Sequence, residues 1–175
     1  MFKFCPMCKS SRISFERNRV FRCPDCNFVY YNNVAAATGC IIHREEDILF
    51  SVREKDPARG KLDLPGGFVD PDEGALECLC RECQEELGWC PSENITFFAS
   101  FPNTYPYKNV IYKTCDMYFT VFVPNVKESD FKIDPSEINS VRFVKKSEIN
   151  FDDIAFDSTK RAIKAFLSKF GLNKE

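Results

Sequence analysis

Apolar residues recur along this chain in two spacings, which separate expected strands from expected helices. Short apolar runs rich in β-branched and aromatic residues, bounded by charged, proline- or glycine-containing segments, predict strands. The expected strands cover residues 34–43, 48–53, 95–101, 114–123 and 140–145. Charged residues 44–47 separate the first two, which predicts a hairpin, whereas the polar segments 54–61 and 125–135 predict loops.

Two segments carry apolar residues at helical spacing. The core-facing positions expected in the first helix are Leu76, Leu79, Cys83 and Leu87. Asp70-Pro71-Asp72 provides its start signal, and Gly88 is the residue type that commonly ends a helix in a left-handed turn. Asp157-Ser158 caps the second helix. Its apolar stripe comprises Ala162, Ile163, Phe166, Leu167 and Phe170.

Composition bounds the class of protein. The chain has 175 residues, 44% of them apolar, which is enough for one medium domain with a core and a small additional module. It lacks an apolar stretch of about twenty residues and an apolar segment before its first cysteines, so we expect a cytoplasmic protein without a membrane partner. Residues 1–33 carry six Lys or Arg against two acidic residues. This small excess does not favour a nucleic-acid partner.

Four of the ten cysteines form two Cys-x-x-Cys pairs near the N-terminus. Cys5 and Cys8 make the first pair, Cys23 and Cys26 make the second, and 14 residues separate the two pairs. This spacing predicts a zinc ribbon over residues 1–33, in which four thiolates close a structural tetrahedral site. A redox pair is the alternative, but no strand-helix unit precedes either motif.

The other six cysteines lie in apolar surroundings and are expected to be small core residues. They are Cys40, Cys78, Cys80, Cys83, Cys90 and Cys115. The single histidine, His43, falls in an expected strand, where a structural role is the simpler interpretation.

Three glutamates share one face of the first expected helix. Glu82, Glu85 and Glu86 are spaced i, i+3 and i+4, so their carboxylates repel one another. Glu85 can pair with Arg81 one turn earlier, but Glu82 and Glu86 have no cation three or four residues away. A divalent cation such as Mg²⁺, which prefers oxygen ligands, would relieve the repulsion. A solvated acidic face is the alternative.

These glutamates belong to a longer pattern, G-x5-E-x7-R-E-x-x-E-E-x-G. Its members are Gly67, Glu73, Arg81, Glu82, Glu85, Glu86 and Gly88. The pattern resembles the signature of the Nudix hydrolases, with Cys83 and Trp89 standing where that family favours aliphatic residues. The resemblance implies an α/β/α sandwich with a mixed sheet over residues 34–175. It also implies cleavage of a nucleoside diphosphate linked to another group, with Mg²⁺ or Mn²⁺.

The resemblance also implies roles for individual residues. Glu82 and Glu86 would be the main metal ligands, with Glu85 and the carbonyl of Gly66 as further ones. Glu73 would pair with Arg81 and orient the ligand face. Glu137, which follows Asp134-Pro135-Ser136, resembles an extra metal-binding carboxylate; a surface position at the start of a strand is the alternative.

A zinc ribbon joined to a Nudix domain resembles the NADH pyrophosphatase branch of the family. That branch carries a second signature, S-Q-P-W-P-F-P-x-S, which residues 100–108 match at Ser100, Pro102 and Pro106. Because the match is incomplete, we expect no large preference for NADH over NAD or ADP-ribose. Tyr105 and Tyr107 would either stack on a substrate ring or pack at the strand end.

Other interpretations stay open at this stage. Arg53 and Lys61 would be phosphate contacts or solvated charges. A non-catalytic module that senses ADP-ribose would be favoured by a missing carboxylate, and none is missing. An enzyme that removes NAD caps from RNA would be favoured by a strongly basic ribbon. The oligomeric state is also open, a homodimer included.

Overall fold

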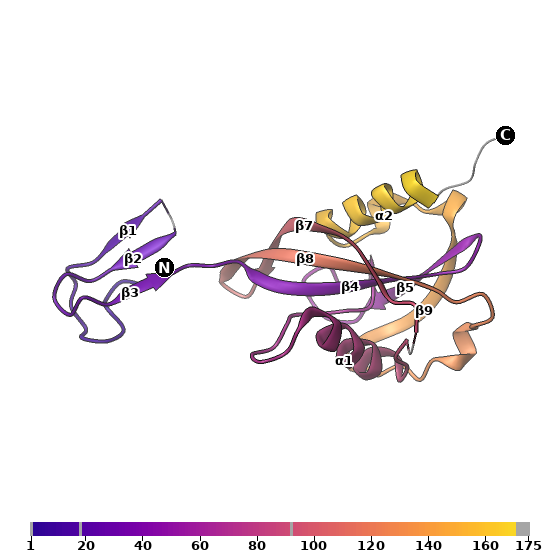
Figure 1. Ribbon diagram of the computed structural model, residues 1–175, viewed down its shortest axis with the longest axis horizontal. Helices are drawn as coiled ribbons and strands as arrows, with labels where there is room; N and C mark the ends of the chain where they lie inside the picture. Colours follow the sequence, from indigo (N-terminus) through magenta and orange to yellow (C-terminus); the bar gives the residue numbers. More distant parts are fainter. Residues whose placement is uncertain (1, 18, 92, 171–175) are drawn as a thin grey trace. The chain divides into compact units, whose positions relative to one another are not determined.

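The computed structural model describes residues 2–17, 19–91 and 93–170. The chain divides into two compact units, Met1–Val34 and Ala35–Glu175 (Figure 1). This division lies one residue from the domain boundary expected between residues 33 and 34. No helix within the described ranges is long and apolar enough to cross a membrane.

The first unit is a three-stranded antiparallel sheet. Its strands, in spatial order, are β1 (Ser14–Glu16), β2 (Val20–Arg22) and β3 (Val29–Tyr31). The buried core consists of Cys5, Phe21 and Cys23, with three partly buried apolar residues packed against it. Such a small core provides little stability by itself, which is why units of this size generally depend on a bound metal.

The second unit is built on a mixed six-stranded sheet. Its strands are β4 (Ala35–His43), β5 (Asp47–Arg53), β6 (Leu62–Asp63), β7 (Thr96–Tyr107), β8 (Val110–Phe122) and β9 (Ile138–Lys145). The order is β6-β5-β4-β8-β7, and β9 also pairs with β5. Only β4 and β8 run parallel, and the other pairs are antiparallel.

Two helices cover opposite faces of this sheet (Figure 1). Helix α1 (Ala75–Leu87) buries Leu79, Cys83 and Leu87 against one face, and α2 (Asp157–Phe170) buries Ile163 and Phe166 against the other. Three 3-10 turns lie in the connections: η1 (Glu128–Asp130), η2 (Lys146–Glu148) and η3 (Phe151–Asp153). The expected α/β/α sandwich with a mixed sheet is confirmed.

Several local expectations differ from the structure. The hairpin of β7 and β8 is longer than expected, because paired strands continue to Tyr107 and Val110. Helix α1 begins at Ala75, after an N-cap at Gly74, since Asp72 has a positive φ of 70° that no helix can contain. Leu76 is 48% exposed, so its assignment to the core is wrong. It lies in the first turn, where periodicity alone does not show whether a partner is present.

The remaining cysteines divide into two groups. Cys40, Cys78 and Cys83 are buried, as expected for small core residues. Cys80, Cys90 and Cys115 are only partly buried, so a core position is wrong for them. His43 is half-buried on β4, where its ring packs against Phe122 and Phe166.

Candidate metal and nucleotide site

A glycine-containing loop before α1 lies directly on strand β4. The amides of Thr38 and Cys40 donate to the carbonyls of Gly67 and Pro65, both at 2.8 Å. Gly66 has a φ of +145°, and a Cβ there would lie 2.2 Å from the carbonyl oxygen of Thr38. Only glycine fits this close approach of two backbones. The loop therefore holds the backbone of residues 66–68 against the acidic face of α1.

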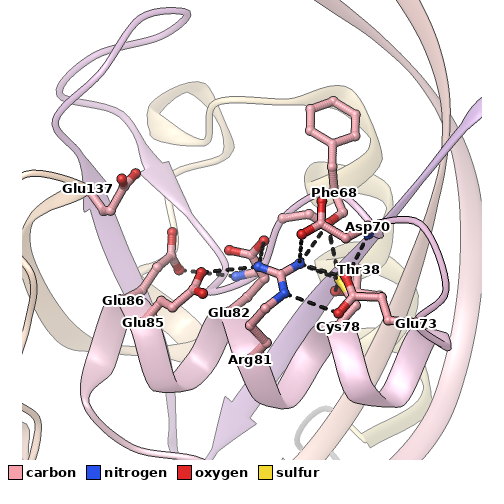
Figure 2. Close-up of polar contacts among 12 residues, drawn as sticks. Thr38, Phe68, Asp70, Glu73, Cys78, Arg81, Glu82, Glu85, Glu86 and Glu137 are labelled. Carbon is pink, nitrogen blue, oxygen red and sulfur yellow. Dashed lines mark hydrogen bonds and ion pairs between the residues drawn. The ribbon is translucent and has the colours of Figure 1, made fainter.

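Arg81 joins the glutamates to this loop (Figure 2). Its guanidinium donates to Glu73 at 2.7 and 3.1 Å and to the carbonyl of Phe68 at 3.0 Å. The same group donates to Glu82 at 2.8 Å and to Glu85 at 3.1 Å. Helical spacing had suggested that no cation lies near Glu82. Arg81, its immediate neighbour in the chain, is nevertheless such a cation, because its side chain turns toward the carboxylate of Glu82.

On this face of α1, Glu82 and Glu86 are less solvated than Glu85: the side chain of Glu82 is 16% exposed, that of Glu86 is partly buried and that of Glu85 is 56% exposed. Burial raises the pKa of Glu86 to about 8, although the amide of Gly66 donates to its carboxylate at 3.1 Å. Burial also raises the pKa of Glu82, against the effect of Arg81. Because burial disfavours the ionised form of both carboxylates, a cation bound between them would favour that form.

Glu73 and Glu85 are in a different environment. Hydrogen bonds from Arg81, followed by the amide of Asp70, lower the pKa of Glu73 to about 2. Glu73 is therefore held as an anion that anchors Arg81. The side chain of Glu85 is 56% exposed and points along the open side of the helix (Figure 2).

The loop that carries Glu137 is tied to the end of α1. The amides of Lys132 and Asp134 donate to the carbonyls of Leu87 and Glu86, at 2.7 and 3.2 Å. Glu137 itself pairs with Lys55 at 2.7 Å and makes no drawn contact with the helix carboxylates (Figure 2). The structure thus brings this loop to the glutamate face, while the Glu137 carboxylate is engaged elsewhere.

The four N-terminal cysteines form a compact cluster. The sulfurs of Cys5 and Cys26, and those of Cys8 and Cys23, lie 3.6 Å apart, and all four are within 4.8 Å of one another. Four sulfurs at about 2.3 Å from a tetrahedral zinc would be about 3.8 Å apart, so the cluster fits this ion. Within the described part of the chain, no other Cys, His, Asp or Glu side chains gather this closely in threes.

Two adjoining pockets lie on the sheet face beside the glycine loop. A polar cavity of about 120 Å³ is lined by Arg53, Asp63, Asp116, Tyr105 and Phe156, among others. An apolar groove of about 440 Å³ is lined by Ala35, Phe68, Tyr105, Tyr107 and Tyr112. Phe68 and Tyr105 line both, and their rings meet edge to face at 5.3 Å. The sequence had singled out Tyr105 and Tyr107 but neither of the buried aspartates.

The two basic residues considered earlier are both engaged. Arg53 donates to Asp63 at 3.1 Å and to the carbonyl of Pro57 at 2.8 Å, and it lies over the ring of Phe156. It is therefore a wall of the polar cavity rather than a solvated charge. Lys61 donates to the carbonyl of Asp152 at 2.8 Å.

Residues 34–166 match the NUDIX domain family. The chain belongs to the Nudix family. A crystal structure of a NUDIX hydrolase from Nitrosomonas europaea is similar with a TM-score of 0.70 and 25% identity, over 96% of this chain and 92% of that one. The resemblance inferred from the glutamate pattern is confirmed, and the fold it implied is present.

Two curated relatives are similar over shorter stretches. The NAD-capped RNA hydrolase NudC of Photobacterium profundum is 23% identical over 146 residues, which are 83% of this chain and 51% of that protein. The ADP-ribose pyrophosphatase of Methanocaldococcus jannaschii is 35% identical over 82 residues, 46% of this chain and 48% of that protein. The chain thus spans about half the length of these relatives.

Proposed function

We propose that this protein is a divalent-metal-dependent hydrolase of the pyrophosphate in a nucleoside diphosphate linked to another group. NADH, NAD and ADP-ribose are the expected substrates, and AMP is the expected product. The observation that carries the proposal is the geometry of Glu82 and Glu86, which share one face of α1 beside a glycine loop: the amide of Gly66 donates to Glu86 at 3.1 Å, and the backbone of Gly67 lies against the carboxylate of Glu82. The names of the two curated relatives support this substrate class.

Mg²⁺ or Mn²⁺ is the expected ion at this site. Bound there, it would neutralise phosphate oxygens and lower the pKa of a water molecule. Glu82 and Glu86 would hold it, with Glu85, the carbonyl of Gly66 and, from its separate loop, Glu137. The carboxylates of this set supply the hard oxygen donors that both ions prefer.

The chain positions these ligands through its own hydrogen bonds. Arg81, anchored by the ionised Glu73, holds the side chains of Glu82 and Glu85 on the open face of α1. The amide of Gly66 orients Glu86. Arg81 and Glu73 are thus positioning residues in this proposal.

Tyr105 and Tyr107 are proposed to bind a substrate ring. Both line the apolar groove, and their rings are stacked at 6.5 Å between centroids. Stacking of a base on such a side chain contributes about 1–3 kcal/mol. The groove begins at Phe68, whose carbonyl contacts Arg81, so a ring bound there would lie near the glutamates.

The cysteine cluster is proposed to hold a structural Zn²⁺. All four positions of a tetrahedral site are taken by Cys5, Cys8, Cys23 and Cys26, which leaves none for a substrate. The ion would complete the fold of the ribbon, whose apolar core is small.

Removal of NAD from the 5′ end of RNA is a second candidate. It involves the same pyrophosphate bond, and one relative is named an NAD-capped RNA hydrolase. On the ribbon, Phe4, Tyr30 and Tyr31 are 59%, 43% and 55% exposed, so aromatic surface is available for stacking on single-stranded bases. NAD-capped RNA therefore belongs in the substrate panel.

The test is a product assay with NADH, NAD, ADP-ribose, NAD-capped RNA and nucleoside triphosphates, each with Mg²⁺ or Mn²⁺. We expect release of AMP, or of 5′-monophosphate RNA. Glu86→Gln should lower kcat at least about 100-fold, because it removes a ligand charge and keeps the shape. Glu148→Gln, the same change at a 63% exposed side chain, is the control. Strong preference for triphosphates, or near-normal turnover by Glu86→Gln, would contradict the proposal.

A further inference from the structure

Asp116 is a buried carboxylate that retains hydrogen-bonding capacity. It is 8% exposed, and its two oxygens accept from Thr114 Oγ1 at 2.5 Å and from Ser158 Oγ at 2.6 Å. No lysine or arginine within the described ranges forms an ion pair with it. Each carboxylate oxygen can accept about two hydrogen bonds, so each has room for a further donor.

The neighbouring Asp63 is more fully engaged, and one of its partners is a cation. It accepts from Arg53 at 3.1 Å, from Thr159 at 3.1 Å and from the amide of Leu64 at 3.0 Å. Of the two carboxylates that line the polar cavity, Asp63 is therefore a structural anchor for Arg53. Asp116, which accepts two bonds from hydroxyl groups and none from a cation, has the larger unused acceptor capacity.

Strand register forms the cavity in front of Asp116. The parallel pairing of β4 and β8 sets Ala37 opposite Asp116 and Gly39 opposite Tyr118. The ring of Tyr118 packs directly on Gly39, where a Cβ would lie 2.8 Å from it, whereas the small side chain of Ala37 leaves space in front of Asp116. The resulting cavity of about 120 Å³ is comparable to the engineered cavity of about 150 Å³ that binds benzene. It therefore fits a single six-membered ring.

The aromatic walls of the cavity favour a planar ring as its ligand. The position of the cavity places that ring close to the proposed pyrophosphate site. Tyr105 and Phe156 line it, with ring centroids 5.4 Å apart. Gly66 and Gly67 also line it, and they approach the carboxylates of Glu86 and Glu82. A ring in the cavity and a phosphate at the glutamates can thus belong to one molecule.

We propose that this cavity binds a six-membered nitrogen ring bearing an amino or carboxamide NH2 group, with Asp116 as the acceptor of its hydrogen bond. Asp116 would then determine which dinucleotides are cleaved. The inference rests on the proposed function and adds a specificity-determining residue to it. Two parts of NAD carry this chemistry, the adenine amine and the nicotinamide carboxamide.

Two NAD analogues, tested on the wild-type protein, show whether the adenine amine or the nicotinamide carboxamide binds to Asp116. Nicotinamide hypoxanthine dinucleotide replaces the adenine amine with oxygen, and nicotinic acid adenine dinucleotide replaces the carboxamide with a carboxylate. We expect kcat/KM for one analogue to be at least about 100-fold below that for NAD, because a site built around a hydrogen bond rejects a ligand that lacks the donor. The affected analogue identifies the ring in the cavity.

Asp116→Asn should reduce this discrimination to less than about tenfold, since asparagine offers an N–H to the analogue's oxygen. Asp152→Asn, the same change on the exposed η3 turn, should preserve it. If Asp116→Asn does not fold, Ala37→Leu provides a second variant. It fills the cavity from β4 and should weaken NAD binding at least about tenfold.

Calorimetric titration of the three dinucleotides without added Mg²⁺ or Mn²⁺ separates this inference from the proposed function. Discrimination in binding with no cleavage under any metal condition would support the pocket and overturn the hydrolase. Binding and cleavage of both analogues within threefold of NAD would overturn the role of Asp116 and leave the hydrolase intact. Discrimination that persists in Asp116→Asn would also overturn it.

Discussion

Single residues control the shape of the glutamate face. The backbone of Gly67 passes so close to α1 that a Cβ there would lie 2.3 Å from a carboxylate oxygen of Glu82. The obstructing atoms belong to the far end of a flexible side chain, so that side chain, rather than the backbone, would move. The position of Glu82 therefore depends on the absence of a side chain fifteen residues earlier in the chain.

We predict that Gly67→Ala lowers kcat/KM about 100-fold through displacement of Glu82, since small misplacements of catalytic groups have effects of this size. Its unfolding free energy should change by less than about 1 kcal/mol, the range of a mild surface change. Gly74→Ala is the matched control, because a Cβ there meets only Glu77, at 3.3 Å. Steady-state kinetics and urea unfolding provide the measurements, and full activity of Gly67→Ala would contradict the prediction.

The single histidine provides a prediction of pH dependence. Burial, followed by the charge of Lys146, lowers the pKa of His43, which packs between Phe122 and Phe166. Its neutral form is favoured by folding, so the protein loses stability as the pH falls below about 6.5, the value of the unfolded chain.

The only imidazole resonance should therefore titrate below about 6.5 in a proton NMR experiment. His43→Phe should remove part of the loss of unfolding free energy between pH 7 and pH 5. A midpoint above about 6.5 would show that the ring environment has been misinterpreted.

Helix α1 contributes both to the core and to the proposed metal site. One face buries apolar residues against the sheet, and the other carries the glutamates. Leu79 is fully buried, whereas Leu76, three positions earlier, is 48% exposed. Both residues belong to the same apolar stripe in the sequence, so only the packing of the element distinguishes them.

Leu79→Ala should destabilise the protein by about 2–5 kcal/mol, because it leaves a cavity in a closely packed core. Leu76→Ala, the identical change on the same helix, should alter the unfolding free energy by no more than about 0.5 kcal/mol. Chemical denaturation of both variants measures the difference. Equal effects would mean that Leu76 is covered in solution.

At the scale of the whole molecule, the two compact units have different sources of stability. Residues 35–170 contain two apolar clusters, one on each face of the sheet. Among its described residues, 2–17 and 19–34, the first unit has only Cys5, Phe21 and Cys23 as its buried core. Its order is expected to depend on a metal, and that of the second unit is not.

Protein purified without added metal should contain about one zinc ion per chain, held by the four clustered cysteines. Cys23→Ser should lose the zinc and make residues 1–34 sensitive to protease, while the main thermal transition is retained. Cys90→Ser, a change at a cysteine outside the cluster, should keep the zinc. Elemental analysis and limited proteolysis test this, and zinc-free wild-type protein would refute it.

Local spacing in the sequence determined much of this protein. The Cys-x-x-Cys pairs, the helical period of α1 and α2 and the spacing of the glutamates depend only on residues close together in the chain. For that reason the cysteine cluster and the glutamate face were predictable, and the fold class followed from the family that the glutamate pattern resembles.

Tertiary structure alone decided the rest, because its contacts join distant segments. Ser158 reaches Asp116 across 42 positions, and the register of β4 and β8 opens the cavity in front of that carboxylate. The loop of Glu137 joins the end of α1 through backbone hydrogen bonds, which leave no trace in residue type. Burial of individual side chains, and with it the raised pKa of Glu86, follows from packing that no local pattern records.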